Sequence, residues 1–436
     1  MASEWTSVTL GEIAADGNRP FAMGPFGSNI RSENYRDTGV PVIRGTNLSV
    51  AGGSRFISDD FAYLSEDKAD ELRSSTALAN DIVFVAQGTV GKVGIVPKSD
   101  KYDRYILSQN LMRVRLNERK ANPLYVYYFF QSADGQQEIL SRANPTGVPC
   151  ISRPLESLRS FKVCLPSQVD EQKQIAHILG TLDDKIELNR KMNETLEAMV
   201  RALFKSWFVD FDPVRAKAEG RDPGRPAPIA ALFPDSFEDS ELGEIPAGWA
   251  VQSIYEIADV TYGAPFASSL FNSEKHGKPL LRIRDLRNET PSVWTPEEHP
   301  KGYLVKPGDI VVGMDGEFRA YIWGGDETWL NQRICVFVPK KFSGAAFVIN
   351  SIHAPLAHIE ATETATTVIH LGKSDIDRFH VTVPTKEVLS EFNKFCQPWY
   401  DQIICCKLQS RVLTSVRDSL LPKLISGELR VDAESA

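Results

Sequence analysis

Histidines, glycine-rich loops and metal-ligating clusters carry much of enzyme chemistry, and this chain of 436 residues has none of them in a working pattern. Its seven histidines are scattered, and His353 and His358 lie five positions apart, so they lack the spacing of two zinc ligands on one helical face. The segment GTVGKVG, from Gly88, matches neither a phosphate-binding loop nor a dinucleotide fingerprint. We expect its glycines to form turns, with backbone amides approaching a phosphate as the alternative. The sequence therefore predicts no catalytic residue and no metal ligand.

Two shorter motifs imitate enzyme signatures and are better explained by helix starts. The sequence NPLY from Asn122 resembles the Asn-Pro-Pro-aromatic loop of amino-methyltransferases, but Leu124 replaces the second proline and no glycine-rich cofactor loop precedes it. Glu171, Gln172 and Lys173 resemble the tail of a nuclease motif, yet they stand at the head of a long stretch with helical periodicity. We interpret the first motif as a helix start and the second as helix capping.

What remains is a set of polar side chains near expected strand ends, in corresponding places of two halves of the chain. Arginine, asparagine and glutamine read base edges through paired hydrogen bonds, and lysine and arginine hold phosphates. Two interpretations stay open: these residues contact DNA bases, or they are solvated strand ends and buried turn anchors. Arg44 and Arg282, identical in both halves, suit the anchor interpretation, whereas positions that differ suit sequence readout. The candidates are Arg44, Thr46, Asn47, Gln87, Lys92, Gln109, Asn110 and Arg113 in the first half, and Arg282, Arg284, Asp285, Arg287, Asp315, Arg319, Gln332 and Arg333 in the second.

The two halves are an internal duplication, because seven blocks recur in the same order. Short aliphatic runs after polar turns predict strands, and residues 123–143 have the apolar spacing of a helix over a sheet. We therefore expect two β-rich mixed α/β domains in tandem. The paired blocks are WTSVTLGEIA with WAVQSIYEIA, GPFGSNI with APFASSL, GVPVIRGTNL with GKPLLRIRDL, NDIVFVAQG with GDIVVGMDG, SQNLMRVRL with NQRICVFVP, FKVCLP with FHVTVP, and the long helices that follow.

Each half ends in a long predicted helix whose apolar residues recur in steps of three and four, the pattern of a coiled-coil seam. Two helices of matched length and matched seam in one chain can bury their stripes on each other. Polar seam residues would set the register at some cost in stability. The expected seam is Ile175, Leu179, Leu182, Ile186, Asn189, Asn193, Leu196, Val200 and Leu203 in the first helix, and Phe392, Cys396, Trp399, Ile403, Cys406, Ser410, Leu413, Arg417 and Leu420 in the second.

The pattern predicts six segments along the chain. Six prolines and many charges between the halves indicate a linker or a loosely packed excursion, and Pro422 is expected to kink or stop the second helix. The predicted segments are an N-terminal domain (1–166), a central helix (167–212), a Pro-rich linker (213–245), a C-terminal domain (246–384), a second helix (385–430) and a tail (431–436).

Composition narrows the class of protein. The net charge of −8 argues against a surface that is basic throughout, so nucleic-acid binding would need local patches or a more basic partner. No apolar run is long enough to span a membrane, and the start of the chain lacks the pattern of a secretory signal. The six cysteines form no CxxC pair, which predicts reduced thiols in a cytoplasmic protein.

A family resemblance rests on GVPVIRGTNL and GKPLLRIRDL, the SQN and NQR segments, the stretch from Leu165 to Lys217 that includes WFVDFDPV, and the ending SVRDSLLPKLISGELRV. Together these motifs resemble the specificity (S) subunit of type I restriction–modification systems over almost the whole chain. The resemblance implies two target-recognition domains separated by two helices. Those helices would pair as an antiparallel coiled coil with a pseudo-twofold axis. It implies no catalytic residue in this subunit.

The resemblance also implies the partners: double-stranded DNA, two methyltransferase (M) subunits docked on the coiled coil, and restriction/translocase (R) subunits. This chain would bind no cofactor, while its bacterial or archaeal partners would use S-adenosylmethionine for adenine methylation and ATP with magnesium for nuclease activity. Each domain would read one half of a bipartite, asymmetric site, with half-sites about one DNA turn (roughly 34 Å) apart. The alternative is a scaffold that assembles methyltransferase partners without reading sequence. A stand-alone enzyme is disfavoured, and exposed helix faces could drive self-association of the isolated chain.

Overall fold

The computed structural model describes residues 4–17, 19–99, 101–144, 147–362 and 370–431, so the predicted tail beyond residue 431 lies outside the described residues. The chain divides into two compact units, and each unit takes part of both long helices. Unit 1 comprises residues 1–187 and 412–436, and unit 2 comprises residues 188–411. Among the described residues, no helix is both long enough and apolar enough to cross a membrane.

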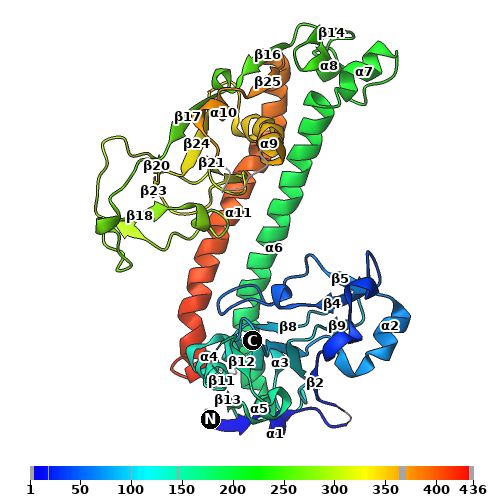
Figure 1. Cartoon of the computed structure of the whole chain (residues 1–436), viewed down its shortest axis with the longest axis vertical. Coiled ribbons are helices and arrows are strands. Elements are labelled where there is room, and N and C mark those ends of the chain that lie inside the picture. Colours follow the sequence, from blue (N-terminus) through cyan, green and yellow to red (C-terminus); the bar gives the residue numbers. More distant parts are fainter. Residues whose placement is uncertain (1–3, 18, 100, 145–146, 363–369, 432–436) are drawn as a thin grey trace. The chain divides into compact units, whose positions relative to one another are not determined.

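Unit 1 contains a four-stranded antiparallel sheet and a five-stranded mixed sheet (Figure 1). Both faces of the central strands β7 (Ile82–Val85) and β10 (Leu111–Val114) are buried, which explains why β7 reads as a continuous apolar run, although β10 includes Arg113. The first sheet has the order β2 (Phe21–Met23), β10 (Leu111–Val114), β7 (Ile82–Val85) and β8 (Val93–Ile95), and the second has the order β3 (Tyr35–Arg36), β5 (Ala62–Leu64), β4 (Val40–Ile43), β9 (Tyr105–Leu107) and β6 (Thr76–Ala77).

Two short two-stranded sheets and five short helices complete the globular part of unit 1. The expected helix over residues 123–143 is present as two helices, and the Asn122 side chain caps the first by accepting a hydrogen bond from the backbone N–H of Tyr125 at 2.9 Å. The other elements are β1 (Trp5–Thr9) paired with β13 (Lys162–Pro166), β11 (Ala143–Asn144) paired with β12 (Cys150–Ile151), and the helices α1 (Leu10–Ile13), α2 (Glu66–Glu71), α3 (Pro123–Gln131), α4 (Ala133–Leu140) and α5 (Pro154–Ser160).

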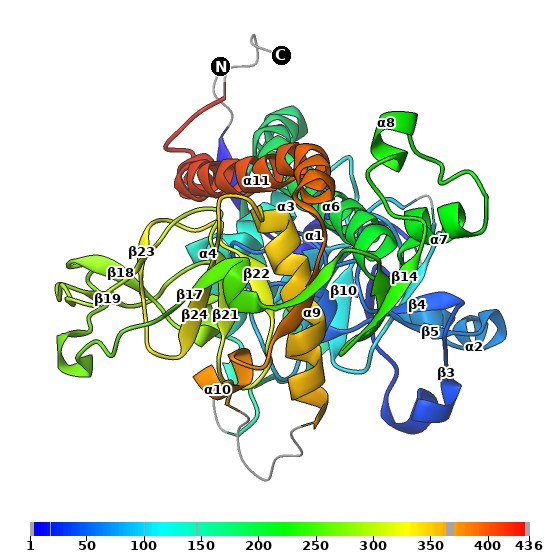
Figure 2. The same ribbon diagram turned by 90° about the horizontal axis from the view of Figure 1, so that it is seen from above.

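Unit 2 repeats this arrangement. Its helix α9 (Ala345–Thr362) lies against β22 (Ala320–Ile322) and β24 (Ile334–Pro339) (Figure 2). In the same way, α3 lies against β8 and β13 in unit 1. The sheets are β17 (Ala258–Tyr262), β24 (Ile334–Pro339), β21 (Ile310–Gly313) and β22 (Ala320–Ile322) in one, and β19 (Trp294–Thr295), β18 (Lys278–Leu281), β23 (Thr328–Leu330) and β20 (Leu304–Val305) in the other, with β16 (Ala250–Ser253) paired to β25 (His380–Val383) and a short helix α10 (Lys373–Ile376).

The strand orders confirm the predicted tandem α/β repeat. In both units the second sheet holds one parallel pair, Ile43 beside Leu107 in unit 1 and Leu281 beside Leu330 in unit 2. One detail differs from the sequence alignment. The backbone N–H of Gly24 donates to Leu111, and that of Gly263, not Ala264, makes the same bond to Ile334. The second half therefore carries one extra residue at this point.

The two long helices are α6 (Val169–Phe208) and α11 (Lys386–Ser426). Within unit 2, Asn189 of α6 donates to Ser410 of α11, and the ring of Phe208 meets that of Phe392 edge-on, with ring centroids 4.9 Å apart. Residue numbers rise along one helix as they fall along the other, so the pairing is antiparallel. All eighteen expected seam positions are buried or half-buried.

Of the two expected effects of Pro422, a kink or a stop, the stop is wrong, because α11 continues to Ser426. The last turn is held by packing: Leu424 and Ile425 are buried in the same unit 1 core cluster as Ile175 and Leu179. A proline removes one helical hydrogen bond, and burial of two aliphatic side chains offsets that loss.

The predicted linker is packed into the core of unit 2 rather than loosely attached. Val214 and Phe233 are almost completely buried, and the Phe233 ring meets Trp207 edge-on at 5.0 Å. Lys217 donates a 3.3 Å hydrogen bond to the carbonyl of Ala230. The prolines suggested flexibility, but several of them begin ordered elements. Prolines stand in the first turn of the helices α7 (Asp212–Ala218) and α8 (Ala227–Ala230), and the segment also forms the strands β14 (Phe237–Ser240) and β15 (Gly243–Pro246).

Candidate functional site

In unit 1, the ends of three strands meet at the predicted polar segments. The backbone N–H of Ser108 donates to the carbonyl of Ile43 at 2.9 Å, which joins the β9–β10 turn to the end of β4. The backbone N–H of Ala86, just after β7, donates to Asn110 at 2.8 Å. The Lys92 ammonium donates to the carbonyl of Gly45 at 3.0 Å, so this half-buried lysine holds the turn after β4.

The same convergence occurs in unit 2. The backbone N–H of Met314, just after β21, donates to Arg333 at 2.9 Å, as Ala86 does to Asn110. The N–H of Gly263 donates to Ile334 at 2.9 Å and brings the end of β17 to the same place. Each unit therefore brings several of its predicted residues to one end of its sheets.

The turns after β4 and β18 contain the structural anchors. In unit 1 the backbone N–H of Arg44 donates to the Asn47 side chain at 2.8 Å, and the Asn47 amide donates to Ile57 at 2.9 Å. In unit 2 the N–H of Arg282 donates to the Asp285 carboxylate at 3.1 Å, and the Arg282 side chain donates to Ser292 at 2.6 Å. Asn47 and Asp285 are buried, so these two candidates shape the turns and do not face a ligand.

Arg113 also belongs to the interior. It is 4% exposed, and its guanidinium donates to the backbone carbonyls of Thr76, Arg19 and Pro20 at 3.0–3.1 Å. Burial lowers its pKa, while the neighbouring Asp81 carboxylate opposes that shift. Because Arg113 alternates with apolar residues in its strand, the sequence did not indicate that it lies in the core. Its side chain is not available to DNA.

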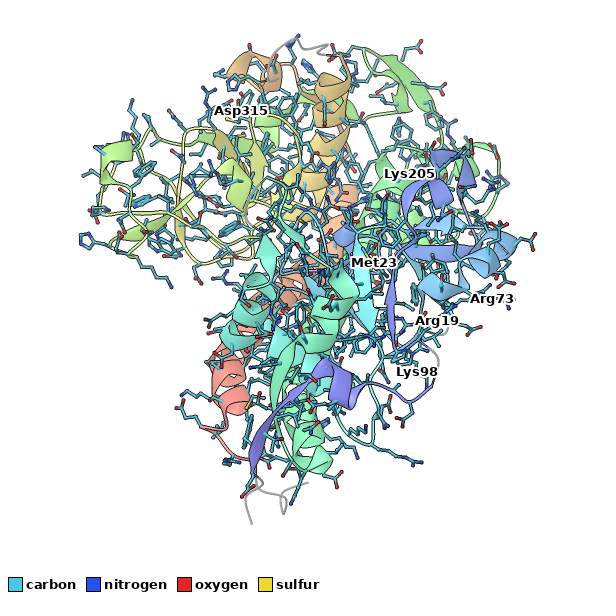
Figure 3. The ribbon with its side chains drawn as sticks, turned by 60° about the horizontal axis from the view of Figure 1, so that its bottom comes forward. Arg19, Met23, Arg73, Lys98, Lys205 and Asp315 are labelled. Atoms are coloured by element: carbon cyan, nitrogen blue, oxygen red, sulfur yellow. The ribbon has the colours of Figure 1, made fainter. Side chains whose placement is uncertain are left out.

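The remaining candidates form the exposed part of each site. Their amide, hydroxyl and guanidinium groups project from turns at the strand ends, and Figure 3 marks one of them, Asp315, after β21. The exposed residues are Thr46, Gln87, Gln109 and Asn110 in unit 1, and Arg284, Arg287, Arg319, Gln332 and Arg333 in unit 2, with Asp315 half-buried.

Unit 2 adds a residue that the sequence analysis missed. The His370 imidazole lies with its Nδ1 2.7 Å from the Asp315 carboxylate and 3.1 Å from Nη1 of Arg333. Arg333 also forms an ion pair with Asp315 at 3.6 Å. An isolated β-bridge to Asp315 and the adjacent backbone bond from Leu371 to Met314 bring His370 here. No spacing in the sequence signals that bridge.

Comparison with known proteins decides the family. Residues 2–198 and 246–404 match the model of the type I restriction modification DNA specificity domain. The chain belongs to this family. It is 25% identical to the type I restriction enzyme HindI specificity subunit of Haemophilus influenzae, over 98% of this chain and 100% of that protein. It is 36% identical to the EcoBI specificity subunit of Escherichia coli, over 31% of this chain and 29% of that protein. The crystal structure of the S subunit from M. genitalium shows the same fold, with a TM-score of 0.53 at 15% identity. The match covers 97% of this chain and 96% of that subunit.

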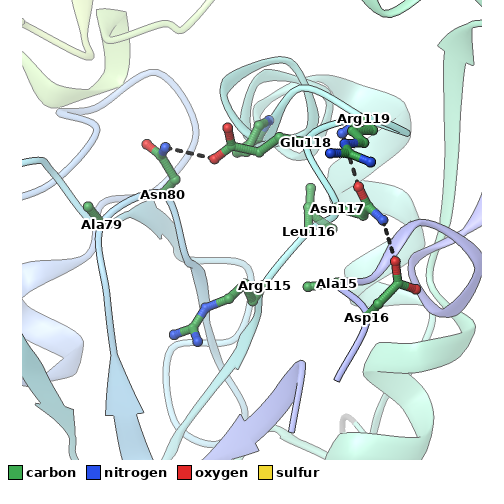
Figure 4. Close-up of a pocket in the computed structure, with 10 residues that line it drawn as sticks. Ala15, Asp16, Ala79, Asn80, Arg115, Leu116, Asn117, Glu118 and Arg119 are labelled. Carbon is green, nitrogen blue, oxygen red and sulfur yellow. Dashed lines mark hydrogen bonds between the residues drawn. The ribbon is translucent and has the colours of Figure 1, made fainter. Parts of the chain in front are cut away.

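A hollow of about 410 Å³ lies at the opposite ends of β7 and β10 in the first specificity domain (Figure 4). Several polar groups that line it bind one another: the Asn80 amide donates to Glu118 at 3.1 Å, and the Asn117 amide donates to Asp16 at 2.8 Å. Arg115 pairs with the buried Asp81 beneath it at 2.7 Å. These contacts join the turns at the end of the domain that lies away from Gln87 and Asn110.

Proposed function

We propose that this chain is the DNA sequence-specificity subunit of a type I restriction–modification complex, with each domain reading one half of a bipartite, asymmetric site. One observation carries the proposal: the two domains share one backbone frame at the strand ends but expose different polar side chains on it. Gln87 and Asn110 occupy the positions that Asp315 and Arg333 occupy in the second domain. A shared frame with changed polar groups suits two half-sites of different sequence.

Electrostatics fits a subunit that works inside a larger assembly. The net charge of −8 limits the counterion release that this chain alone can obtain from a DNA backbone. The exposed Arg284, Arg287 and Arg319 supply local positive charge in the second domain. Most of the affinity would then come from phosphate contacts made by the other subunits, and this chain would supply the sequence selection.

The partners in this proposal are two methyltransferase subunits and the restriction/translocase subunits. The antiparallel helices α6 and α11 would dock the methyltransferases and fix the distance between half-sites. S-adenosylmethionine for adenine methylation, and ATP with magnesium for DNA cleavage, would be bound by those partners and not by this chain. The exposed polar faces of both helices leave room for such docking.

The test is to co-express the chain with its cognate methyltransferase and map methylated adenines across the host genome. One asymmetric bipartite motif is the expected result. Exchange of residues 1–164 for the corresponding block of a related chain should then change only one half of the motif. If the complex assembles but methylation is absent or scattered, the chain is a scaffold that does not read sequence, and the proposed readout is wrong.

A further inference from the structure

Three backbone contacts define the same three positions in both domains. The bond from Ala86 to Asn110 matches the bond from Met314 to Arg333. The N–H of Ile151 donates to Ala86 at 2.8 Å, and the N–H of Leu371 donates to Met314 at 2.7 Å. Isolated bridges then pair residue 87 with 150 and residue 315 with 370. We call these three positions the reading triad: Gln87, Asn110 and Cys150 in the first domain, and Asp315, Arg333 and His370 in the second.

The two triads differ in chemistry. In the first triad, Gln87 and Asn110 are neutral amides, whereas the second triad consists of an acid, an arginine and a histidine. An amide forms paired hydrogen bonds with adenine through N6 and N7, whereas an arginine forms them with guanine through O6 and N7. Since the backbone frame is shared, the difference in side chains should appear as a difference in base preference.

Arg333 is held in place before any DNA binds. Its Nη1 faces the His370 Nδ1 at 3.1 Å and the Asp315 carboxylate at 3.6 Å, while 54% of its side chain stays exposed. Within the described residues these contacts use one terminal nitrogen, which leaves the edge formed by Nε and Nη2 available. That edge is a planar pair of donors, as the O6 and N7 acceptors of guanine require.

The neighbouring acid favours a base edge over a phosphate as the target. The Asp315 carboxylate is 28% exposed beside Arg333, and it would repel a phosphate oxygen brought to the same guanidinium. A carboxylate can instead accept a hydrogen bond from cytosine N4, the group that lies beside guanine O6 in a G·C pair. Asp315 and Arg333 together therefore complement one G·C pair.

We propose that Arg333, positioned by Asp315 and His370, reads the guanine of a G·C pair in the half-site of the second domain, and that Gln87 and Asn110 read an A·T pair at the corresponding place of the other half-site. This inference rests on the proposed function and specifies its base chemistry. Arg333 contacts the guanine, Asp315 both positions Arg333 and can accept a hydrogen bond from the paired cytosine, and His370 acts as a positioning residue.

The test uses the complete complex of this chain with its methyltransferase. Methylation motifs and competition binding with duplexes that change one base pair at a time are compared for the wild type, Arg333→Gln, Arg333→Lys, Asp315→Asn and the matched control Arg378→Gln. Arg378 is also an exposed arginine of the second domain beside an aspartate, but it lies outside the triad. Circular dichroism and melting temperature establish that each variant folds.

The expected result is that Arg333→Gln lowers discrimination for guanine at one position of one half-site by about 5- to 150-fold. Arg333→Lys should keep guanine as the preferred base with weaker discrimination, because lysine reaches the same acceptors without a planar fork. Asp315→Asn should lower the discrimination for guanine at the same position more than it lowers the overall affinity for DNA. A purely structural defect would lower the affinity for all the duplexes alike. Arg378→Gln should leave the motif unchanged.

The inference is overturned if the second half-site contains no G·C pair, or if folded Arg333→Gln keeps the wild-type preference at every position. In both cases a bipartite motif would still exist, so the proposed function would stand. Absence of any motif with the wild-type complex would instead overturn the proposed function. Absence of an A·T pair at the corresponding position of the first half-site would overturn the assignment of Gln87 and Asn110.

Discussion

The guanidinium of Arg417 donates a 2.7 Å hydrogen bond to the carboxylate of Asp183, and both side chains are more than nine-tenths buried. Asp183 also accepts from the Tyr128 hydroxyl at 2.6 Å, and Arg417 donates to the carbonyl of Gly52 at 2.6 Å. Burial, with the Asp183 charge beside it, raises the pKa of Tyr128, so the hydroxyl keeps its donor proton. This network ties α6, α11, α3 and a loop of the first domain together within unit 1.

Removing one partner of this ion pair should destabilise unit 1 strongly. Asp183→Ala leaves the buried Arg417 with only the exposed Asp418 as an acidic partner, and Arg417→Ala leaves the buried Asp183 with only Arg55, 4.0 Å away, so we expect each to cost up to about 3–5 kcal/mol of unfolding free energy. The double variant Asp183→Leu with Arg417→Met should be more stable than either single variant, because no charge remains buried. Urea unfolding followed by circular dichroism measures the difference.

Lys173 provides the control for that series, because its pair with Asp170 is exposed on both sides. Lys173→Ala should change the unfolding free energy by less than about 1 kcal/mol. Equal effects of Arg417→Ala and Lys173→Ala would show that the buried pair does not hold unit 1 together.

A second prediction concerns the polar contact in the helix pair of unit 2. The buried Asn189 amide donates to Gln409 at 2.9 Å, to Ser410 at 3.2 Å and to the carbonyl of Cys406 at 3.4 Å. Asn189→Leu removes this set without stranding a buried donor, since the Ser410 hydroxyl already donates to Cys406 at 2.8 Å. We expect a gain in melting temperature with a less specific helix register.

Hydrogen exchange and light scattering check this prediction on the full chain. Asn189→Leu should speed amide exchange along both helices or broaden the distribution of oligomers, although unfolding occurs at higher temperature. Asn189→Ala is the matched variant, and it should lower the melting temperature because it leaves a void. Unchanged exchange and a single unchanged oligomer in Asn189→Leu would mean that apolar packing alone fixes the register.

Two glycines that the repeat places in equivalent positions form the third prediction. A Cβ at Gly24 would lie 1.8 Å from the carbonyl oxygen of Ser108, and one at Gly263 would lie 1.9 Å from that of Asn331. Gly24→Ala and Gly263→Ala must push back the turns that carry Asn110 and Arg333. We expect each to cost roughly 2–4 kcal/mol.

Gly45 is the control, because nothing lies within 4 Å of its added Cβ. Gly45→Ala should stay within about 0.5 kcal/mol of the wild type in thermal unfolding. In the assembled complex, any folded Gly24→Ala protein should relax one half of the methylation motif and Gly263→Ala the other. Relaxation of the same half by both variants would contradict the equivalence of the two positions.

Sequence patterns were sufficient for the tandem repeat and both long helices because these depend on local features. Aliphatic runs such as the one at Val83 become strands, and a repeated three-four spacing becomes a helix wherever a partner buries its stripe. The packing of residues 213–245 was not predictable in the same way. Prolines and charges dominate its composition, whereas a few apolar residues such as Phe233, placed against Trp207, decide its structure.

The candidate site was predictable in outline but not residue by residue. Asn47 and Gln87 look alike in sequence, yet one is buried in a turn and the other is exposed at a strand end. Whether a single polar residue is buried depends on the tertiary fold, and no periodic pattern in the sequence indicates it. The bridge that brings His370 to Asp315 joins segments far apart in the chain, so only the structure shows it.

The last prediction concerns two titratable groups that line a cavity of about 120 Å³ in unit 2, where α9 faces the helix pair. Burial raises the pKa of Glu197, and the positive charges of Lys407 and Arg201 only partly oppose it. The residue His353 is exposed overall, but the groups packed around its ring in this cavity remove part of its solvation and lower its pKa, and Arg201 adds to that shift. The two groups therefore weaken unit 2 at opposite ends of the pH range.

The signs follow from which state binds more protons. A carboxyl with a raised pKa in the folded state is destabilising at neutral pH, and the penalty disappears as pH falls to the ordinary value of 4.5. Glu197→Gln should therefore raise the melting temperature at pH 7 and have little effect near pH 4. A histidine with a lowered pKa is destabilising when pH falls below its ordinary value of 6.5, so His353→Gln should raise the melting temperature in acid and have little effect at pH 8. Melting curves of both variants between pH 4 and pH 8 test this, and parallel curves would show that neither group is buried enough to affect stability.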